Sequence, residues 1–437
     1  MSDSRIVFTE ANLIDGEHPA KAGINVVVEG ERIQSVGEAT PKARPGDRIV
    51  PLGGRTLMPG MVQAHFHSHF GAFGEGVTAP ALGLEAAPPF LSMLAAVNAR
   101  TALHCGFTGA LGSSSGHGID VCLKEAILLG LVEGPRYRAC TRELVTTGES
   151  SDYPNNRTWF MELGNKGLTY EVDGADAWRH ATRAELGRGA DVVKISASPG
   201  HGSVPARDVM YLTREELRAC VDTAHTLGKK VRAHVASRIG VLECARAGVD
   251  VIDHADRLDE ECIEAILEAG SFVVPSMLWT VRFLEIAENW DHAEKPLPIS
   301  EGHPEELATT LERIRGVRED FEYTARMMPE ANRAGVKMVV GDDFGTPVMP
   351  HGTYVDELEL YVKQLGFPAL DVIRWATKNG ADLLDLGDEA GTVEPGKLAD
   401  LLVVDGDPLT DIGCLREPSL LAILKGGAFV KDALPGG

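Results

Sequence analysis

Short runs rich in valine, isoleucine and alanine alternate with helical patterns through the middle of the chain, between residues 57 and 385. A strand followed by a helix and then another strand implies a parallel sheet that is buried on both faces. We count about eight such units, the number that closes a (β/α)8 TIM barrel. The expected strands lie at residues 61–67, 106–111, 136–139, 190–195, 230–234, 250–254, 271–275 and 336–341.

Both ends of the chain show a different pattern, in which short β-like runs are separated by turn residues. We expect the two ends to fold together into a small β-sandwich beside the barrel. The predicted α/β organisation has an N-terminal sandwich part at 1–56, a catalytic barrel at 57–385 and a C-terminal sandwich part at 386–437. Two long connections, 141–180 and 276–335, follow barrel strands and are candidate walls or lids of a substrate site.

The charge of the chain limits its partners. It has 42 lysines and arginines against 64 aspartates and glutamates, a formal net charge of −22, and no long basic run. Nucleic acid and anionic membrane surfaces are therefore disfavoured, no apolar stretch approaches the roughly 20 residues that span a bilayer, and no signal peptide is expected.

The seven cysteines include no Cys-x-x-Cys pair, which favours reduced thiols in a cytoplasmic protein. We expect a small-molecule substrate and a homo-oligomeric assembly.

Histidines gather where the expected barrel strands end. His65 and His67 close the first strand, and they point to the same side because side chains in a strand alternate with period two. His234 and His254 close two successive later strands. A lone histidine at a strand end is usually structural, but four at one rim of a barrel predict a metal site, since neutral imidazole is a common metal ligand.

Two charged residues extend this set. Lys194 lies in a run that should be buried on both faces, where an unpaired ammonium is costly. Either its end reaches water, or its neutral amine captures carbon dioxide to form a carbamate that can bridge two metals. Asp343 ends the eighth strand, where it can ligate a metal and move a proton, or simply form a turn beside glycine. The adjacent Asp342 is expected to point elsewhere.

These features resemble the amidohydrolase superfamily. The segment MPGMVQAHFH at residues 58–67 is similar to the opening signature of that superfamily, and GTVEPGKLADL at residues 391–401 is similar to its return to the β-sandwich. The lysine, the two later histidines and the aspartate follow the order of the superfamily along the strands. Several short elements resemble its imidazolonepropionase and Xaa-Pro dipeptidase (prolidase-like) branch: GFT at 106–108, VKI at 193–195, VPS at 274–276 and PHG at 350–352.

The resemblance implies a binuclear metal-dependent hydrolase of carbon–nitrogen bonds. One divalent ion would be held by His65, His67 and Asp343, the other by His234 and His254, and carboxylated Lys194 would bridge them. Zn²⁺ is the expected metal, with manganese, cobalt, nickel or iron also compatible. A hydroxide between the ions would attack the substrate, and Asp343 would take its proton and deliver it to the leaving nitrogen. Tyr211 and His351 are the further catalytic candidates, for contact with the substrate or its oxyanion.

Two positions depart from the family pattern. Gln63 stands where relatives usually have aspartate, and TGES at residues 147–150 stands where they often have Thr-Gly-Gly-His. The substrate can therefore differ from that of a dipeptidase, and amide, peptide, carbamate and urea bonds all stay open. Aromatic residues expected near the rim favour a small apolar or aryl-bearing substrate; they are Phe70, Phe73, Trp159, Trp279 and Phe344.

A cyclic-amide hydrolase of the imidazolonepropionase type is the main alternative. A mononuclear deaminase is disfavoured because that class pairs the strand-five histidine with a glutamate three residues later, where this chain has Ser237. A non-catalytic barrel is disfavoured because all six ligand positions are intact. His69 is expected to lie past the metal, either just behind its ligands or simply solvated. His201 is expected to be a loop histidine, with a substrate contact as the alternative.

Overall fold

The computed structural model describes residues 5–71, 86–148, 167–200, 208–290, 307–346 and 348–434. Its centre is built from parallel strands in two sheets, ordered β6-β7-β8 and β10-β9-β11-β12-β13-β14-β15. The strands are β6 (Met61–Phe66), β7 (Phe107–Gly112), β8 (Arg136–Arg138), β9 (Cys140–Val145), β10 (Thr169–Glu171), β11 (Val192–Ser196), β12 (Lys230–Val235), β13 (Val251–His254), β14 (Phe272–Val274) and β15 (Lys337–Met338).

The two parallel sheets fit the predicted barrel. Only Ala139 separates β8 from β9, so one continuous segment joins the sheets on that side. On the other side the Ala64 N–H of β6 donates to the Val340 carbonyl, just after β15, at 2.9 Å. Each of the eight runs predicted as barrel strands overlaps a strand of the structure. The mixed α/β class is thus confirmed.

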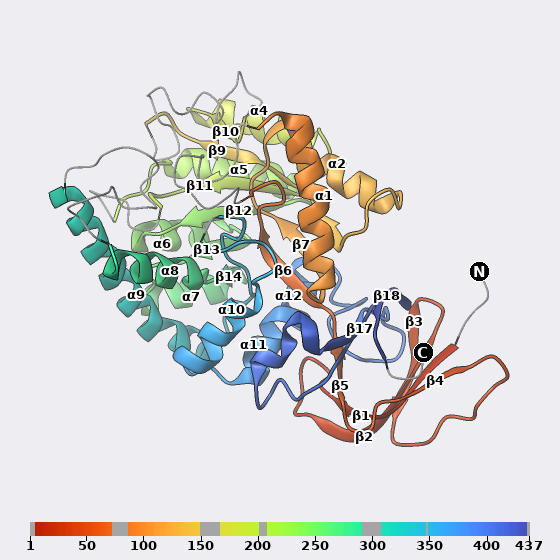
Figure 1. The fold of residues 1–437 in the computed structure, drawn as a ribbon. Helices are drawn as coiled ribbons and strands as arrows, with labels where there is room; N and C mark the ends of the chain where they lie inside the picture. The colour runs from red at the N-terminus through yellow and green to blue at the C-terminus, as the bar shows by residue number, and fades with distance from the viewer. Residues whose placement is uncertain are drawn as a thin grey trace.

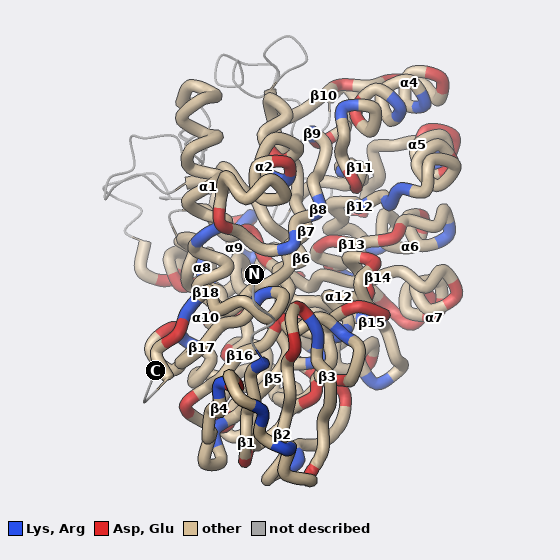
Figure 2. Tube along the Cα trace, turned by 90° about the vertical axis from the view of Figure 1, so that its right-hand side faces the viewer, with Lys and Arg blue, Asp and Glu red and all other residues tan. Residues whose placement is uncertain are grey.

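Helices lie along the outside of these strands (Figure 1). They are α1 (Pro88–His104), α2 (Ile119–Leu128), α4 (Ala175–Leu186), α5 (Arg214–Thr226), α6 (Arg238–Ala247), α7 (Glu260–Ala269), α8 (Met277–Glu288), α9 (Leu307–Ala334), α10 (Val355–Glu359), α11 (Ala369–Arg374) and α12 (Gly380–Leu383). In Figure 2, acidic and basic residues are interspersed over α4, α5 and α6, whereas α7 carries only acidic ones. Among the described residues, no helix is both long and apolar enough to cross a membrane.

Local signals set the length of the strand–helix units. Thr213, Ser237 and Asp259 each accept a hydrogen bond from a backbone N–H in the first turn of α5, α6 and α7, respectively. Gly248 and Gly270 end α6 and α7 in the left-handed conformation, with φ of 85° and 72°. These caps start and stop each helix within a few residues of a strand, which returns the chain to the same rim of the barrel.

The two chain ends meet in a separate eight-stranded sheet, ordered β18-β17-β16-β5-β1-β2-β3 with β4 paired to β1. Its strands are β1 (Arg5–Leu13), β2 (Lys21–Glu29), β3 (Arg32–Gly37), β4 (Arg48–Pro51), β5 (Thr56–Pro59), β16 (Leu401–Val404), β17 (Leu420–Lys425) and β18 (Ala428–Asp432). Strand β5 joins the ends, because it pairs with β1 on one side and β16 on the other. The ends therefore associate as expected, while the two-layered sandwich form stays a prediction.

Strand β5 continues through Gly60 into β6, so the terminal sheet leads directly to the strand that carries His65. Gly341, just after β15, lies against that strand. A Cβ atom on Gly341 would stand 2.5 Å from the His65 backbone nitrogen and 2.8 Å from the His65 Cβ. Only glycine lets the two strands approach this closely.

We predict that Gly341→Ala lowers the free energy of unfolding by about 1–3 kcal/mol, because a side chain forced into a filled core displaces its neighbours. Urea unfolding of the metal-free protein measures the change. Gly37→Ala is the matched control, since a Cβ there meets no atom within 4 Å. Equal stabilities for the two variants would contradict the prediction.

Candidate metal centre

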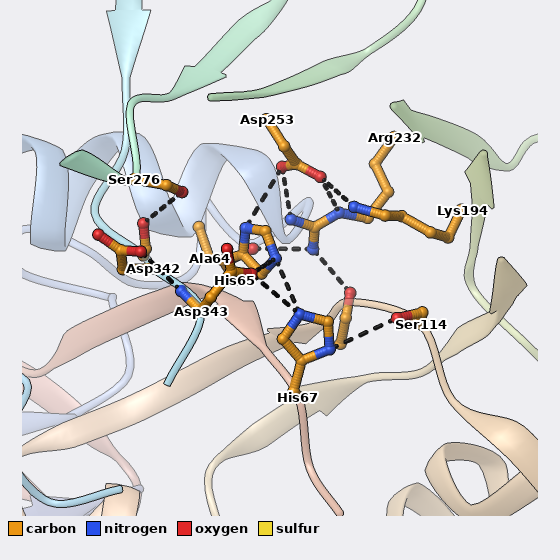
Figure 3. Close-up of polar contacts among 12 residues, drawn as sticks. Ala64, His65, His67, Ser114, Lys194, Arg232, Asp253, Ser276, Asp342 and Asp343 are labelled. Atoms are coloured by element: carbon orange, nitrogen blue, oxygen red, sulfur yellow. Dashed lines mark hydrogen bonds and ion pairs between the residues drawn. The ribbon is translucent and has the colours of Figure 1, made fainter. Parts of the chain in front are cut away.

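Three side chains from opposite ends of the barrel sequence converge at one point. His65 Nε2 and His67 Nε2 lie 3.1 Å apart, and Asp343 Oδ1 lies 3.1 Å from the first and 3.2 Å from the second (Figure 3). His65 comes from β6, His67 follows it immediately, and Asp343 follows β15. Strands β6 and β15 are neighbours, which explains how residues 65 and 343 come into contact.

The spacing of these three atoms suits one metal ion. An ion with tetrahedral bonds of about 2.0–2.1 Å holds neighbouring ligand atoms about 3.3 Å apart. The triangle formed by His65, His67 and Asp343 is close to this size, and its members can each offer one ligand atom within 4.8 Å of the others. Imidazole and carboxylate are also the donor types that divalent zinc and its neighbours accept.

The later strand-end histidines lie next to this group. The rings of His234 and His254 are 4.4 Å apart in an edge-to-face arrangement, and the His254 ring is 5.6 Å from that of His65. His254 has a left-handed backbone with φ of 70°. In a regular strand, successive side chains point to opposite faces, so His254 would face away from Asp253 without this left-handed backbone. Left-handed conformations of non-glycine residues are uncommon and collect at functional sites.

Lys194 is held by a buried carboxylate. Its Nζ donates to Asp253 Oδ2 at 2.7 Å, and the two side chains are 3% and 0% exposed, so the lysine does not reach water. Arg232 binds the same carboxylate through two hydrogen bonds, of 3.1 and 2.6 Å, and donates to the carbonyls of Ala64 and Gly112 (Figure 3). Asp253 Oδ1, the oxygen that Lys194 does not bind, lies 3.8 Å from His65 Nδ1.

Sequence reasoning missed Arg232 and Asp253. The available signal was the one that singled out Lys194, a charged residue inside a run that should be buried on both faces. Arg232 lies within KVRAHV and Asp253 within VIDH, both of which are strands. Buried charges are normally paired, so the three should have been sought together.

Burial keeps the two histidines of the triangle neutral. It lowers the pKa of His67 to about 4 and also lowers the pKa of His65, although the Asp343 carboxylate opposes both shifts. Burial alone would raise the pKa of Asp343, but the neighbouring rings of His65 and His67 outweigh it and hold that pKa well below its usual range. Neutral imidazole and ionised carboxylate are the forms that bind a metal.

The two other catalytic candidates lie in different surroundings. Tyr211 is half-buried on the segment between β11 and α5, and its N–H donates to the Ala197 carbonyl at 3.1 Å. Both ring nitrogens of His351 have partners: Nδ1 lies 2.9 Å from the Tyr354 hydroxyl, and Nε2 lies 3.1 Å from the His67 carbonyl oxygen. His351 thus contacts the backbone of a candidate ligand, and its contact with a substrate stays a prediction.

Other residues named from the sequence are also located. The Asp342 carboxylate accepts hydrogen bonds from the backbone N–H groups of Leu278 and Trp279 at the start of α8 and from the Asp343 backbone N–H. The backbone N–H of His65 donates to Gln63 Oε1 at 3.4 Å. His69 is buried rather than solvated, with 1% exposure.

Of the aromatic residues predicted near the rim, Phe70 stacks on the His67 ring with centroids 4.1 Å apart, whereas Phe344 is fully buried and Trp279 stacks on Phe283. Phe73, Trp159 and His201 lie outside the described residues, as do Glu149 and Ser150.

Comparison with known proteins agrees with this fold. The pattern of the Amidohydrolase family matches residues 56–429. The chain therefore belongs to the Amidohydrolase family, which confirms the family and the hydrolytic enzyme class predicted from the motifs. Members of this family generally use divalent metals, and the His65, His67 and Asp343 group is a candidate site for one.

Three similar proteins span most of the chain. Ochratoxinase of Aspergillus niger is 27% identical over 397 residues, which cover 86% of this chain and 75% of the relative. Imidazolonepropionase of Micrococcus luteus is 25% identical over 423 residues, 91% of each chain. The crystal structure of a Xaa-Pro dipeptidase with methionine bound in its active site superposes with a TM-score of 0.81 at 26% identity, covering 98% of this chain and 100% of the other.

We predict that Arg232→Met lowers the free energy of unfolding by about 3–5 kcal/mol, because it removes one partner of a fully buried ion pair. The variant also leaves the carbonyls of Ala64 and Gly112 without their guanidinium donor. Urea unfolding of metal-free protein measures the loss. Arg214→Met is the control: its ion pair with Glu243 is on the surface, where the side chain is 72% exposed. A loss no larger than in this control would contradict the prediction.

His351 predicts a pH dependence. Burial lowers the pKa of its ring to about 3, below the ~6.5 of an unfolded chain. Between these values the unfolded chain binds a proton that the folded protein does not, so stability is lost as the pH falls through this window. We expect His351→Gln to lose stability less steeply than wild type from about pH 7 to 5. The slope of unfolding free energy against pH measures this, with the exposed His180→Gln as control; a slope unchanged from wild type would be the contrary result.

Proposed function

We propose that the protein is a binuclear metal-dependent amidohydrolase that cleaves a carbon–nitrogen bond of a small apolar or aryl-bearing substrate. The observation that carries this proposal is the convergence of His65, His67 and Asp343 within 3.2 Å, next to His254 and to buried Lys194. His65, His67 and Asp343 would hold one ion, and His234 and His254 the other. Zn²⁺ is the proposed ion, because the donors are imidazole and carboxylate.

Local charge supports carboxylation of Lys194. Asp343 is the single carboxylate among the proposed ligands, so two divalent ions would leave the site strongly positive. A lysine ammonium would add to that charge. A carbamate, formed when the neutral amine adds carbon dioxide and releases a proton, would reduce it and offer two oxygens as a bridge. Because Arg232 also binds Asp253, that carboxylate would keep a cationic partner when Lys194 changes its charge.

Bound divalent ions would supply an acidified water and polarise the scissile carbonyl. The residues of the chain supply the remaining steps. Asp343 is 24% exposed at its side chain, the most accessible member of the triangle, so it can accept a proton from the attacking water and return it to the leaving nitrogen. We propose that Tyr211 contacts the substrate from the segment after β11. We propose that His351 supports the position of His67, because its Nε2 lies 3.1 Å from the His67 carbonyl oxygen.

The substrate class rests on two supports. Phe70 stacks on His67 and gives the site an aromatic wall, and similar proteins include an ochratoxinase, an imidazolonepropionase and a Xaa-Pro dipeptidase. Hydrolysis of a cyclic amide is the second candidate, since the similarity to imidazolonepropionase extends over 91% of both chains.

Several structural features complete the proposal. The parallel sheets would form a closed (β/α)8 barrel over residues 57–385, and residues 1–56 and 386–437 a β-sandwich. All seven cysteines are free thiols, which supports a reducing, cytoplasmic location. We also propose a homo-oligomer that takes its substrate without a membrane or nucleic acid.

One experiment tests the function directly. Protein reconstituted with zinc, manganese or cobalt is assayed against dipeptides, N-acyl amino acids, anilides, carbamates, phenylureas and an imidazolone, and its metal content is measured. Near two metals per chain and release of an amine from an acyclic substrate support the proposal. Near one metal, with ammonia released from a heterocycle, would indicate a deaminase, and no metal would contradict catalysis of this type.

We predict that Lys194→Ala abolishes hydrolysis, because it removes the proposed bridge, and that short carboxylic acids such as acetate or propionate restore part of it by supplying a carboxylate in the vacated space. Turnover and metal content are measured with and without the acid. Lys337→Ala, at an exposed lysine of β15, is the control and should keep full activity. Full activity of Lys194→Ala would contradict the carbamate bridge.

A further inference from the structure

The turn that follows β6 is held by side chains from three other parts of the fold. It comprises residues 67–70 and contains the proposed ligand His67. The carbonyls of His67, Ser68 and Phe70 each accept a hydrogen bond from a side chain of another element. Within the turn, the Phe70 N–H donates to the His67 carbonyl at 3.2 Å, and the two rings stack with an interplanar angle of 4°.

Asn98 on α1 makes two of these contacts. Its Nδ2 donates to the carbonyls of Ser68 at 2.8 Å and Phe70 at 2.9 Å, so one amide group spans the turn. Asn98 is 6% exposed, which is unusual for an amide side chain in the middle of a helix. Burial of this amide is costly unless it is hydrogen-bonded, and the turn supplies its acceptors.

His351 makes the third carbonyl contact, and Asp120 in the first turn of α2 holds the turn through the Ser68 side chain. Ser68 Oγ donates to Asp120 Oδ1 at 2.5 Å, while the N–H of Cys140 donates to Asp120 Oδ2 at 3.0 Å. Asp120 is 1% exposed and carries no ion pair with a cation among the described residues. The Asp120 carboxylate therefore links the turn after β6 to the start of β9.

Apart from the proposed metal ligands, the His67 ring has one hydrogen-bond partner among the described residues. Its Nδ1 lies 3.4 Å from the Ser114 hydroxyl, a long contact (Figure 3), and the ring stacks on Phe70. The position of the ring thus depends on the backbone of residues 67–70, and that backbone depends on Asn98 and Asp120. Residues that orient a ligand influence metal affinity without touching the ion.

We propose that Asn98 and Asp120 are positioning residues that orient His67 for metal binding. The proposal rests on the proposed function, because it assigns His67 to a metal. Loss of either contact would let the turn relax and carry the imidazole out of the triangle with His65 and Asp343. The effect should fall on the ion that His67 holds and leave the ion on His234 and His254 less changed.

Two variants test this proposal, Asn98→Leu and Ser68→Ala. The first replaces the amide by an apolar side chain of similar size, and the second removes the hydroxyl that binds Asp120. We expect the affinity for one of the two zinc ions, the one that His67 holds, to fall about 10–100-fold, which is the usual effect of removing a partner that orients a ligand. A chromophoric chelator measures the affinity, and the visible spectrum of the cobalt-substituted protein reports the changed coordination.

The control is Ser92→Ala, which removes an exposed hydroxyl on the same helix α1. A purely structural role would lower the melting temperature of the metal-free variants but leave zinc affinity and the cobalt spectrum unchanged, and this result would overturn the proposal. Ser68→Ala keeps the test decisive if Asn98→Leu does not fold. Wild-type protein that binds no zinc would instead refute the proposed function, so the two failures are distinguishable.

Discussion

The carboxylate of Asp253 is the centre on which the buried part of the site depends. Lys194 and Arg232 both bind it, from β11 and β12, and His65 lies 3.8 Å away on β6. Arg232 extends the network to carbonyls of β6 and β7. Four parallel strands besides β13 therefore have residues that contact one anion or its partners, and the charged side chains are at most 3% exposed. In such surroundings an unmatched charge costs several kcal/mol, so each strand must keep its register for the charges to remain paired.

This network explains how the site can be rigid although its histidines come from short strands. Strand β13, which carries His254, contains only four residues. Hydrogen bonds between the strands fix how far each residue lies along its strand, and the buried ion pairs hold neighbouring strands in that register. His254 then needs a left-handed backbone to face the other histidines. Such a conformation costs of order 1–3 kcal/mol and persists only where surrounding contacts hold it.

Much of the fold and part of the site were predictable, for a physical reason in each case. Parallel strands buried on both faces leave apolar runs in the sequence, and alternation with period two placed His65 and His67 on one side. The site beyond these ligands was less predictable. A strand pattern does not show which buried charge pairs with which, so Arg232 and Asp253 were missed. His351 was assigned from its place after the eighth strand, but its ring is occupied by the Tyr354 hydroxyl and the His67 carbonyl, contacts that depend on how the following loop folds back.

The triangle of His65, His67 and Asp343 also shows why this site favours a cation. Two largely neutral imidazoles bring their Nε2 atoms within 3.2 Å of each other and of an ionised carboxylate. A proton can satisfy one pair of these atoms at a time, and burial opposes adding a second proton to either ring. An ion can satisfy all three at once. Folding therefore brings the lone pairs together at a cost that a bound metal offsets, and any ion that binds the folded chain but not the unfolded one must stabilise it in proportion to its affinity.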